Sequence, residues 1–589
     1  MRKHSVSATH PTNNNGYVSF CAEIITILHR NRRITSLLVL SLTATFCTFP
    51  LLLHASLPQS QDMTYHIFQA DQFWQNLNHG VLYPRWAGGA VNGYGSPNFI
   101  FYSPLSYYFV ALIHLFNSSL VSSMVITIWL SFFLSGITMF LLSSNFFPGY
   151  RALVPAVLYQ ILPFHLYELY LRGSFAALFS FIWFPLILLM LFKIHESSKS
   201  ALPIVSLSFA YAALIMTHLV TAFLFSLLTC LVLLGFLIFR QFRTFIKTAC
   251  AFACGLALSS VYFIPAFMEC RYIHMEYLVS GPWGRYIDNF LFTKDKLHQD
   301  MSQFSHFYSL LHLCVVADLV LFVLILAVAK KRGVKQQRTV FTIFTASFVL
   351  TFLLTTPISK PLLYLIPGLQ TLLFPWRWIA MMELVLAILS GFFFLNTDGA
   401  VIVADKIRNG SIILIYIALS AIIIWTTEIF PGEAVKRFED PARFSYKMTP
   451  GVENIPIWAR NWLEILRGSP PFPVSFVTGK GSYRVEVWEA QKRVVIFRST
   501  LPSLVRISTF YYPGWEADLD GEKAGIAIKE RTGAMLINIP EGEHVLKLIF
   551  GDTPLRVFSR YVSYFFCAIL GFIVVLPFLK YPQSKGNNN

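Results

Sequence analysis

The chain contains long stretches without charge, and the first of them is also the clearest. Residues 35–57 read TSLLVLSLTATFCTFPLLLHASL and contain no Asp, Glu, Lys or Arg. A helix of about 20 apolar residues is long enough to cross the hydrocarbon core of a bilayer. Basic residues at 29–33 precede this stretch, and basic residues are retained on the cytoplasmic side of a membrane. We therefore expect an uncleaved first span whose N-terminus lies in the cytoplasm.

Similar apolar runs recur along most of the chain. Of its 589 residues, 55% are hydrophobic and only 13% are charged, whereas about 25% are charged in a typical soluble protein. The thirteen runs lie near residues 35–57, 101–116, 120–143, 151–166, 174–193, 200–217, 219–240, 247–267, 307–329, 339–356, 377–396, 411–430 and 560–579. The pattern predicts a mainly α, polytopic membrane protein and excludes a water-soluble globular fold.

The net charge of +16 indicates membrane orientation, and we expect no nucleic-acid partner. The basic clusters lie at residues 30–33, 240–247, 330–338 and 580–585. If all four clusters are cytoplasmic, an even number of spans must separate neighbouring clusters, but seven runs separate the first two. The short run 101–116 contains Pro104, so we interpret it as a re-entrant or juxtamembrane helix; the short run 151–166 is the alternative. About twelve transmembrane helices remain, with both termini in the cytoplasm.

A long polar stretch before the last span differs in composition from the rest of the chain. Alternating apolar and polar residues predict short strands at 483–487, 494–497, 504–508, 524–528, 535–539 and 545–550. Turns are expected at Asp520-Gly521, Thr532-Gly533 and Glu541-Gly542. We therefore expect a β-sandwich-like domain on the extracytoplasmic side, either as a lid or spacer or as a sugar-binding or acceptor-positioning module.

These observations predict the following domain organisation. It comprises a cytoplasmic tail (1–34), a transmembrane domain (35–430) with an outer juxtamembrane loop (58–118), the extracytoplasmic β-sandwich-like domain (431–559), a final transmembrane helix (560–580) and a cytoplasmic tail (581–589).

The first outer loop carries the most informative polar residues. Apolar residues between 67 and 77 suit a helix along the membrane surface, with Gly80 as its C-terminal stop. Asp62 and His66 are four residues apart, so they share a face near the start of this helix. Asp62 is equally well placed to be a simple N-cap. Asp71 is expected to face solvent.

Several cationic residues are predicted on the same outer side of the membrane. Arg85 follows the surface helix, while Arg172, His218 and Arg377 lie at the ends of apolar runs. An arginine at a membrane boundary can simply extend to the interface. Three such arginines near an acid and two histidines suit an anion better, because guanidinium groups match phosphate oxygens.

An anion at the membrane surface suggests a lipid phosphate as substrate. The leaving group of a polyprenyl-phosphate sugar is a weak base, so it needs positive charge more than a protonating acid. One carboxylate then suffices as general base for the acceptor hydroxyl, whereas glycoside hydrolysis uses two. The residues therefore favour sugar transfer to a glycan, lipid or protein acceptor.

The order of these motifs resembles the bacterial multi-pass proteins called 6-pyruvoyl-tetrahydropterin synthase-related, which look like GT-C superfamily glycosyltransferases. The matching segments are Asp62-x3-His66, His79-Gly80-Val81-Leu82-Tyr83-Pro84-Arg85-Trp86, Gly93-Tyr94-Gly95-x-Pro97, Phe101-Tyr102-x-Pro104-Leu105, Arg172-Gly173, His218, Phe374-Pro375-Trp376-Arg377, Tyr512-Pro513-Gly514-Trp515 and Asp520-Gly521. The resemblance implies a GT-C glycosyltransferase fold in the bacterial inner membrane.

The resemblance implies that Asp62 is the catalytic residue, and the shared outer placement of the acid and the arginines predicts the further roles. Asp62 would be the catalytic carboxylate or a ligand of a divalent cation such as Mg²⁺ or Mn²⁺, and His66 would assist it. The substrate phosphate would lie near four cationic residues and one tyrosine: Arg85, Arg172, His218, Arg377 and Tyr102. Relatives often carry Glu shortly after the Arg-Gly pair. Here none follows Arg172-Gly173, so either Glu168 replaces it from one turn earlier or the second acid is absent.

Two acids inside apolar runs leave other functions open. Asp318 and Glu383 would suit a proton or ion relay in a lipid or solute transporter. The alternative we prefer is that each acid makes an interhelical hydrogen bond. A third possibility is a non-catalytic scaffold for envelope assembly, in which the β-sandwich-like domain binds the partner.

Overall fold

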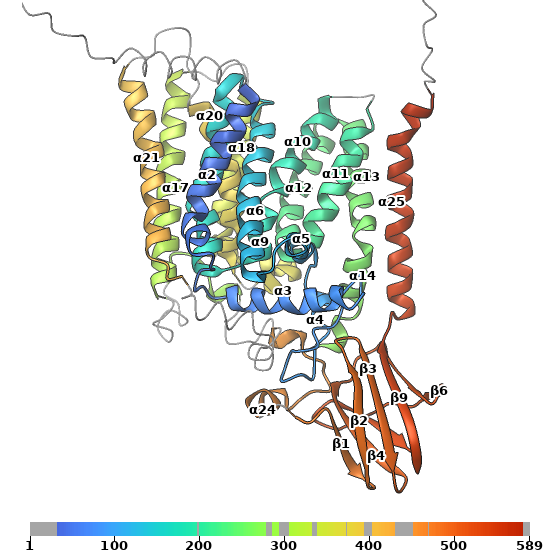
Figure 1. The fold of residues 1–589 in the computed structure, drawn as a ribbon. Coiled ribbons are helices and arrows are strands. Elements are labelled where there is room, and N and C mark those ends of the chain that lie inside the picture. The colour runs from blue at the N-terminus through green and yellow to red at the C-terminus, as the bar shows by residue number, and fades with distance from the viewer. Residues whose placement is uncertain are drawn as a thin grey trace, which may run out of the picture.

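The computed structural model is mostly helical, with a β region near the C-terminus (Figure 1). It describes residues 32–196, 200–277, 286–293, 305–332, 338–372, 374–393, 403–429, 451–468 and 471–580. The predicted tails, except for residues 32–34, lie outside these ranges, and so does the beginning of the polar stretch at 430–450.

Eight helical segments in the described ranges are long and apolar enough to cross a membrane. They are Arg33–His54, Leu120–Ser143, Gly149–Arg172, Phe175–Glu196, Leu219–Ile238, Ser309–Ala329, Pro375–Phe392 and Pro554–Val575. A ninth is added if α13 (Phe242–Leu258) and α14 (Ser260–Met268), which meet at 74°, form one bent span. Each of these coincides with a predicted apolar run.

Four shorter apolar helices also coincide with predicted runs. They are Leu105–His114, Leu202–Thr217, Arg338–Leu354 and Ile413–Trp425. The last three coincide with runs counted as spans, so the total of twelve stays a prediction. The first, α5 (Leu105–His114), coincides with the run interpreted as juxtamembrane, and Figure 1 shows it end-on among helices that stand upright.

The helices form one layer whose lower end in Figure 1 is crossed by α3 (Met63–Asn78). We call this end of the layer the α3 end. Helix α3 ends at Asn78, and Gly80 adopts the left-handed region at φ 81°, so the predicted stop is confirmed. Most of α3 is buried, including every residue from His66 to Phe73. The prediction of a helix along the membrane surface agrees with this position, because α3 runs across the ends of the upright helices.

The remaining helical elements range from long membrane helices to single turns that connect them. They are α2 (Arg32–His54), α4 (Asn98–Phe101), α6 (Leu120–Ser143), η1 (Gly149–Ala152), α7 (Leu153–Ile161), α8 (Pro163–Tyr167), the π-helix η2 (Glu168–Arg172), α9 (Phe175–Ser180), α10 (Trp183–Glu196), α11 (Leu202–Thr217), α12 (Leu219–Ile238), η3 (Cys270–Tyr272), η4 (Tyr286–Asp288), α17 (Ser305–Arg332), α18 (Arg338–Leu354), η6 (Pro357–Ser359), α19 (Lys360–Leu365), η7 (Pro367–Leu372), η8 (Pro375–Trp378), α20 (Ile379–Phe393), α21 (Val403–Trp425), η9 (Val452–Asn454), α24 (Trp462–Arg467) and α25 (Pro554–Lys580).

The β region contains two antiparallel sheets, in the order β1-β4-β8-β7 and β2-β3-β9-β5-β6. Its strands are β1 (Val474–Thr478), β2 (Gly481–Trp488), β3 (Lys492–Ser499), β4 (Ser503–Phe510), β5 (Trp515–Leu519), β6 (Glu522–Ala524), β7 (Ala527–Ile528), β8 (Ala534–Ile539) and β9 (Gly542–Phe550). Inward residues of both sheets are buried, and the Phe476 and Phe497 rings lie 6.2 Å apart between the sheets. The predicted sandwich of antiparallel strands is therefore present.

The strand predictions need two corrections. The predicted strand 524–528 is wrong, because β6 pairs with β5 in one sheet while β7 pairs with β8 in the other. The chain therefore changes sheets at Gly525-Ile526. Strands β1 and β5 were not predicted; β5 carries Glu516 and Asp518, and acidic residues are rare in strands.

A buried ion pair joins the β region to the helices. Arg556, at the start of α25, donates from Nε and Nη2 to the two carboxylate oxygens of Glu269 at 2.9 and 2.8 Å. Tyr512 donates to the same carboxylate at 3.1 Å. Gly514 at φ 115° leaves room for this guanidinium, because an added Cβ would lie 2.6 Å from Nη1. The Tyr512-Pro513-Gly514 motif therefore has a structural role, because it connects the β region to Glu269 and Arg556.

Candidate functional site

Asp62 lies at the start of α3 but does not cap it. In the described part of the chain, its side chain makes no capping hydrogen bond. Its backbone N–H donates to the Arg172 carbonyl at 2.9 Å, and the Gln61 N–H donates to the Leu171 carbonyl at 3.2 Å. The N-cap interpretation of the Asp62 carboxylate is therefore wrong, and the residue is held instead by the end of η2.

Gly173 makes this contact possible. Its φ of 69° places it in the left-handed region after η2, where glycine is favoured. A Cβ at this position would lie 2.2 Å from Ser60 Oγ and 2.8 Å from the Met63 nitrogen. The Arg172-Gly173 pair of the sequence motif thus ends the π-helix and receives the chain beside Asp62.

Arg172 forms a buried ion pair with Glu168 one helical turn earlier. Its Nη1 lies 2.9 Å from both carboxylate oxygens, and both side chains are buried. The guanidinium also lies over the Trp376 ring, 5.0 Å from its centroid. The structure therefore places Glu168, the proposed replacement acid, directly beside Arg172.

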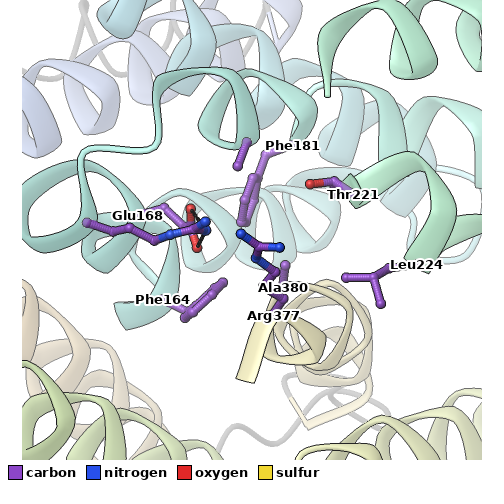
Figure 2. A pocket seen from close by; sticks show the side chains of 9 residues that line it. Phe164, Glu168, Phe181, Thr221, Leu224, Arg377 and Ala380 are labelled. Carbon is purple, nitrogen blue, oxygen red and sulfur yellow. Dashed lines mark hydrogen bonds and ion pairs between the residues drawn. The ribbon is translucent and has the colours of Figure 1, made fainter. Parts of the chain in front are cut away.

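A second guanidinium faces this ion pair across a small cavity. The cavity has a volume of about 10 Å³, room for about one water molecule, and its lining includes Glu168, Arg172 and Arg377. Figure 2 shows Arg377 pointing toward the Glu168 carboxylate, with Thr221 on the other side. Arg377 donates from Nη1 to the Leu372 carbonyl at 2.6 Å, whereas its buried Nε has no partner among the described residues.

Asp62 shares its electrostatic environment with both arginines. Burial raises the pKa of the Asp62 carboxyl above its usual range, and the charges of Arg172 and Arg377 act in the opposite direction. Tyr102 belongs to the same environment: burial raises the pKa of its hydroxyl, and the Asp62 charge raises it further. The structure thus gathers Asp62, Tyr102, Arg172 and Arg377 near the α3 end.

His66 lies inside an aromatic enclosure next to Asp62. Its Nδ1 is 2.8 Å from the Tyr107 hydroxyl, and its ring is 5.8 Å from Tyr102 and 5.9 Å from Phe175. Burial, reinforced by the Arg172 charge, lowers the pKa of His66 to about 3. At neutral pH the imidazole is therefore uncharged and suited to hydrogen bonding with a neutral partner.

His218 belongs to the same region. It stands between α11 and α12, is buried, and hydrogen-bonds Thr221, which also lines the cavity. The charges of Arg377 and Arg172 act on it.

Arg85 lies elsewhere. Its Nε donates to Asp552 Oδ1 at 2.8 Å, and the other oxygen of Asp552 accepts from Arg560 at 2.8 Å. The structure therefore pairs this predicted phosphate ligand with an acid at the base of the β region rather than with the cavity.

Glu453 is the residue near Asp62 that sequence reasoning missed. Burial raises the pKa of its carboxyl, and the Asp62 charge raises it further. The neighbouring Asn454 donates to Asn98 at 2.9 Å, and Asn98 accepts from Tyr65 of α3 at 3.3 Å. No local sequence pattern predicts this position for Glu453, because residues 453 and 62 come close only through the packing of distant parts of the chain.

Asp71 also differs from expectation. It is buried rather than solvated, and its Oδ2 accepts from Gln72 at 3.0 Å and from Gln75 at 2.8 Å.

The described residues offer only a partial metal site. Among them, no group of three or more His, Cys, Asp or Glu side chains could hold an ion. Asp62 with Glu453 as a neighbouring carboxyl fits Mg²⁺ only if other oxygens complete the shell, which is usual for Mg²⁺ bound with substrate phosphates.

The fold defines a polytopic, mainly helical membrane protein. Its ionic site, formed by Asp62, Tyr102, Arg172 and Arg377, lies near the α3 end, and the β region lies at the same end. The chain belongs to the 6-pyruvoyl-tetrahydropterin synthase related family of membrane proteins, whose family model matches residues 99–428. A search of curated proteins finds no match.

Solved structures with partial similarity include those of the Archaeoglobus fulgidus oligosaccharyltransferase. AglB in complex with an inhibitory peptide and a dolichol-phosphate is 11% identical with a TM-score of 0.36, and covers 67% of this chain and 56% of its own. The enzyme with zinc and sulfate is 13% identical with a TM-score of 0.36, covering 71% and 54%. The apo form is 12% identical with a TM-score of 0.39, covering 71% and 56%. The chain thus spans just over half the length of these proteins.

Proposed function

We propose that this protein is a membrane glycosyltransferase of GT-C type that transfers a sugar from a polyprenyl-phosphate donor to an envelope glycan, lipid or protein. One observation carries the proposal: Asp62, whose carboxylate does not cap its helix, shares an environment with two guanidinium groups at a cavity near the α3 end. A base beside an anion site is what transfer from a lipid phosphate requires.

Each residue of the site near the α3 end has a defined role in this mechanism. Arg377, whose Nε lacks a partner among the described residues, binds the donor phosphate, and Arg172 supports it while Glu168 holds its orientation. Asp62 accepts the proton of the acceptor hydroxyl as that oxygen attacks the sugar carbon. The bond between the sugar carbon and the donor phosphate oxygen breaks. Its electron pair leaves with the phosphate oxygen, which lies beside the arginines. His66 and Tyr102 form one wall of the proposed donor site, and His218 forms another wall.

A divalent cation such as Mg²⁺ or Mn²⁺ would be held by Asp62 together with donor phosphate oxygens. It would supply positive charge at the leaving group. Removing divalent cations with EDTA should then lower transfer, and adding Mg²⁺ back should restore it. Full activity in EDTA would remove the cation from the proposal and leave the two arginines as the source of positive charge.

The proposed orientation places the α3 end and the β region on the extracytoplasmic side of the bacterial inner membrane, with both termini in the cytoplasm. Figure 1 supports the second point, since α2 begins and α25 ends at the same end of the layer. We propose the domain boundaries predicted from the sequence, with the β region positioning the acceptor. Arg85 then acts through Asp552, as a contact between the first loop and this region.

The test compares two isosteric changes on one helix. Asp62→Asn should lower sugar transfer in membranes by about 10²- to 10⁴-fold, because the amide accepts no proton. Asp71→Asn should keep wild-type transfer, since its amide oxygen can still accept from Gln72 and Gln75. Lipid-linked sugar consumed and glycan formed are measured together. Transfer at the wild-type rate with Asp62→Asn contradicts the proposal.

A transporter is the second candidate, because Asp318 and Glu383 meet at a break in a membrane helix, a feature of many transporters. It predicts substrate movement that depends on a proton gradient and is indifferent to Asp62→Asn. The scaffold alternative predicts that partner capture depends on the β region and not on either acid site.

A further inference from the structure

Two acids inside the helical layer meet, although they lie far apart in sequence. Asp318 of α17 and Glu383 of α20 are both 0% exposed. The interhelical hydrogen bonds preferred from the sequence are present, because Asp318 accepts from Tyr416 of α21 and Glu383 accepts from the Phe164 N–H of α8. The two carboxyl groups also interact electrostatically with each other. The proposed glycosyl transfer uses neither acid.

The contacts of the pair require at least one proton. Tyr416 donates to Asp318 Oδ1 at 3.1 Å, and the Phe164 N–H donates to Glu383 Oε1 at 2.7 Å. The other oxygens, Asp318 Oδ2 and Glu383 Oε2, have no donor among the described residues. Two carboxylates cannot hydrogen-bond each other, because an ionised carboxylate only accepts. One proton between these two oxygens supplies the missing donor.

Among the described residues, no cationic side chain is in electrostatic contact with the pair. The titratable side chains in electrostatic contact with the pair, within the described ranges, are Cys314, Tyr159 and Tyr416. None of them carries a positive charge. Two like charges in contact at low dielectric are strongly unfavourable, so the two acids are not both ionised.

Glu383 lies at the N-terminus of a broken helix. Helix α7 ends at Ile161, Leu162 has an extended ψ of 139°, and α8 begins at Pro163. The break frees backbone groups: Glu383 accepts from the Phe164 N–H, and Ser420 donates to the Ile161 carbonyl at 2.8 Å. Pro163 has no N–H, so the Phe164 N–H is the first backbone donor of α8, and its hydrogen bond to Glu383 is charge-assisted when that carboxyl is ionised.

The same segment leads directly to the site. Helix α8 continues into η2, which carries Glu168 and Arg172. Ala380, one turn before Glu383 on α20, lines the cavity, and so does Phe164 (Figure 2). The acid pair therefore fixes one end of the segment whose other end holds Asp62.

We propose that Asp318 and Glu383 form a proton-binding site that holds a single shared proton, and that the resulting monoanion clamps the N-terminus of α8 and positions Glu168 and Arg172. Both acids are positioning residues, because they act through α8 and η2.

Isosteric variants of the full chain in nanodiscs test the proton count. In Asp318→Asn or Glu383→Gln, the new amide donates to the remaining carboxylate and replaces the shared proton, so the charge stays at one. Infrared difference spectra against wild type should show the loss of one carboxylic-acid carbonyl band in each. The double variant should lose no further acid band. Loss of twice the intensity in the double variant means two protons, and no loss in either single variant means none; both results overturn the proposal.

Hydrogen–deuterium exchange of peptides covering residues 163–172 tests the positioning. Each single isostere should keep wild-type protection. The double variant, with two amide groups facing each other, and Asp318→Leu, which leaves Glu383 Oε2 without a donor, should lose protection in this segment. Glu516→Gln, an exposed change in β5, is the matched control and should change nothing. Equal protection in all variants overturns the clamp. These readouts need no substrate, so their failure leaves the glycosyl-transfer proposal untouched.

Discussion

Asp62 shows how a single side chain can be misjudged from local sequence. Its position before α3 is that of an N-cap, and its φ and ψ of −105° and −5° lie in the helical region rather than the extended one usual for a cap. The carboxylate therefore stays available, and its environment is set by Arg172 and Arg377 rather than by the N–H groups of α3.

The pH dependence of transfer follows from this environment. A general base acts only when ionised, so transfer should fall as pH falls through the pKa of Asp62. Because burial raises that pKa, the acid limb of kcat/KM should lie above the value of about 3.9 for an ordinary Asp. Arg377→Gln removes a charge that lowers the pKa, so the acid limb should move up by about 1 pH unit.

Arg560→Gln is the control for this shift. Arg560 is partly exposed and pairs with Asp552, so its loss should leave the acid limb in place. An acid limb that stays at the wild-type pH in Arg377→Gln would show that the ionisation observed is not that of Asp62.

Residues of the site divide into those that local spacing predicts and those that it does not. Asp62 and His66 share one helix, and Arg172 and Glu168 share one turn, so helical periodicity is enough to pair them. Glu453 and Asp552 reach α3 and Arg85 only through the path of the β region. The spacing of residues in the sequence gives no information about this path. The ion pair of Arg85 with Asp552 was therefore not predicted, and Arg85 was placed beside the substrate phosphate instead.

At the scale of elements, the α8 and η2 segment is tied to the loop before α3 by close backbone contact, and Gly173 is the residue that permits it. Gly173→Ala should destabilise the fold by about 3 kcal/mol, the sum of a left-handed alanine and a steric clash with Ser60 and Met63. Sugar transfer should fall as well, because the Asp62 segment must move. Thermal unfolding in detergent and transfer assays measure the two effects.

Gly149→Ala separates the two contributions. Gly149 has a similar φ of 75°, but an added Cβ meets nothing within 4 Å. The cost there should be about 1 kcal/mol, from the backbone alone. Equal losses in the two variants would mean that the contact between Gly173 and the Asp62 loop contributes nothing.

Elements were predictable where one local signal was enough. The apolar runs predicted the long helices, and the left-handed φ values of Asp520 and Gly521 match a hairpin turn read from the dipeptide. The break at Leu162 was not predicted, because Glu383 and Ser420 come from other helices to satisfy the freed backbone groups.

At the scale of the whole molecule, ion pairs between described residues hold the β region in place. Glu269 and Arg556 form one pair and are nearly or fully buried, whereas in another pair Arg85 is buried and Asp552 is partly exposed. An amide contact adds to them, since Gln491 donates to Asn76 of α3 at 3.0 Å. These contacts fix the orientation of the β region relative to the site.

The buried pair should dominate this joint. Glu269→Gln should lower the free energy of unfolding by about 3–5 kcal/mol, because it leaves the Arg556 guanidinium buried without a counter-charge. Replacing both residues, Glu269→Leu with Arg556→Met, should cost less than Glu269→Gln alone, because no uncompensated charge remains. Arg560→Gln, which breaks a partly exposed pair with Asp552, should cost less than about 1 kcal/mol. Unfolding in detergent measures all three. If the double replacement costs as much as Glu269→Gln, packing rather than charge holds the β region in place, and the orientation of this region depends on the aromatic contacts around Tyr512.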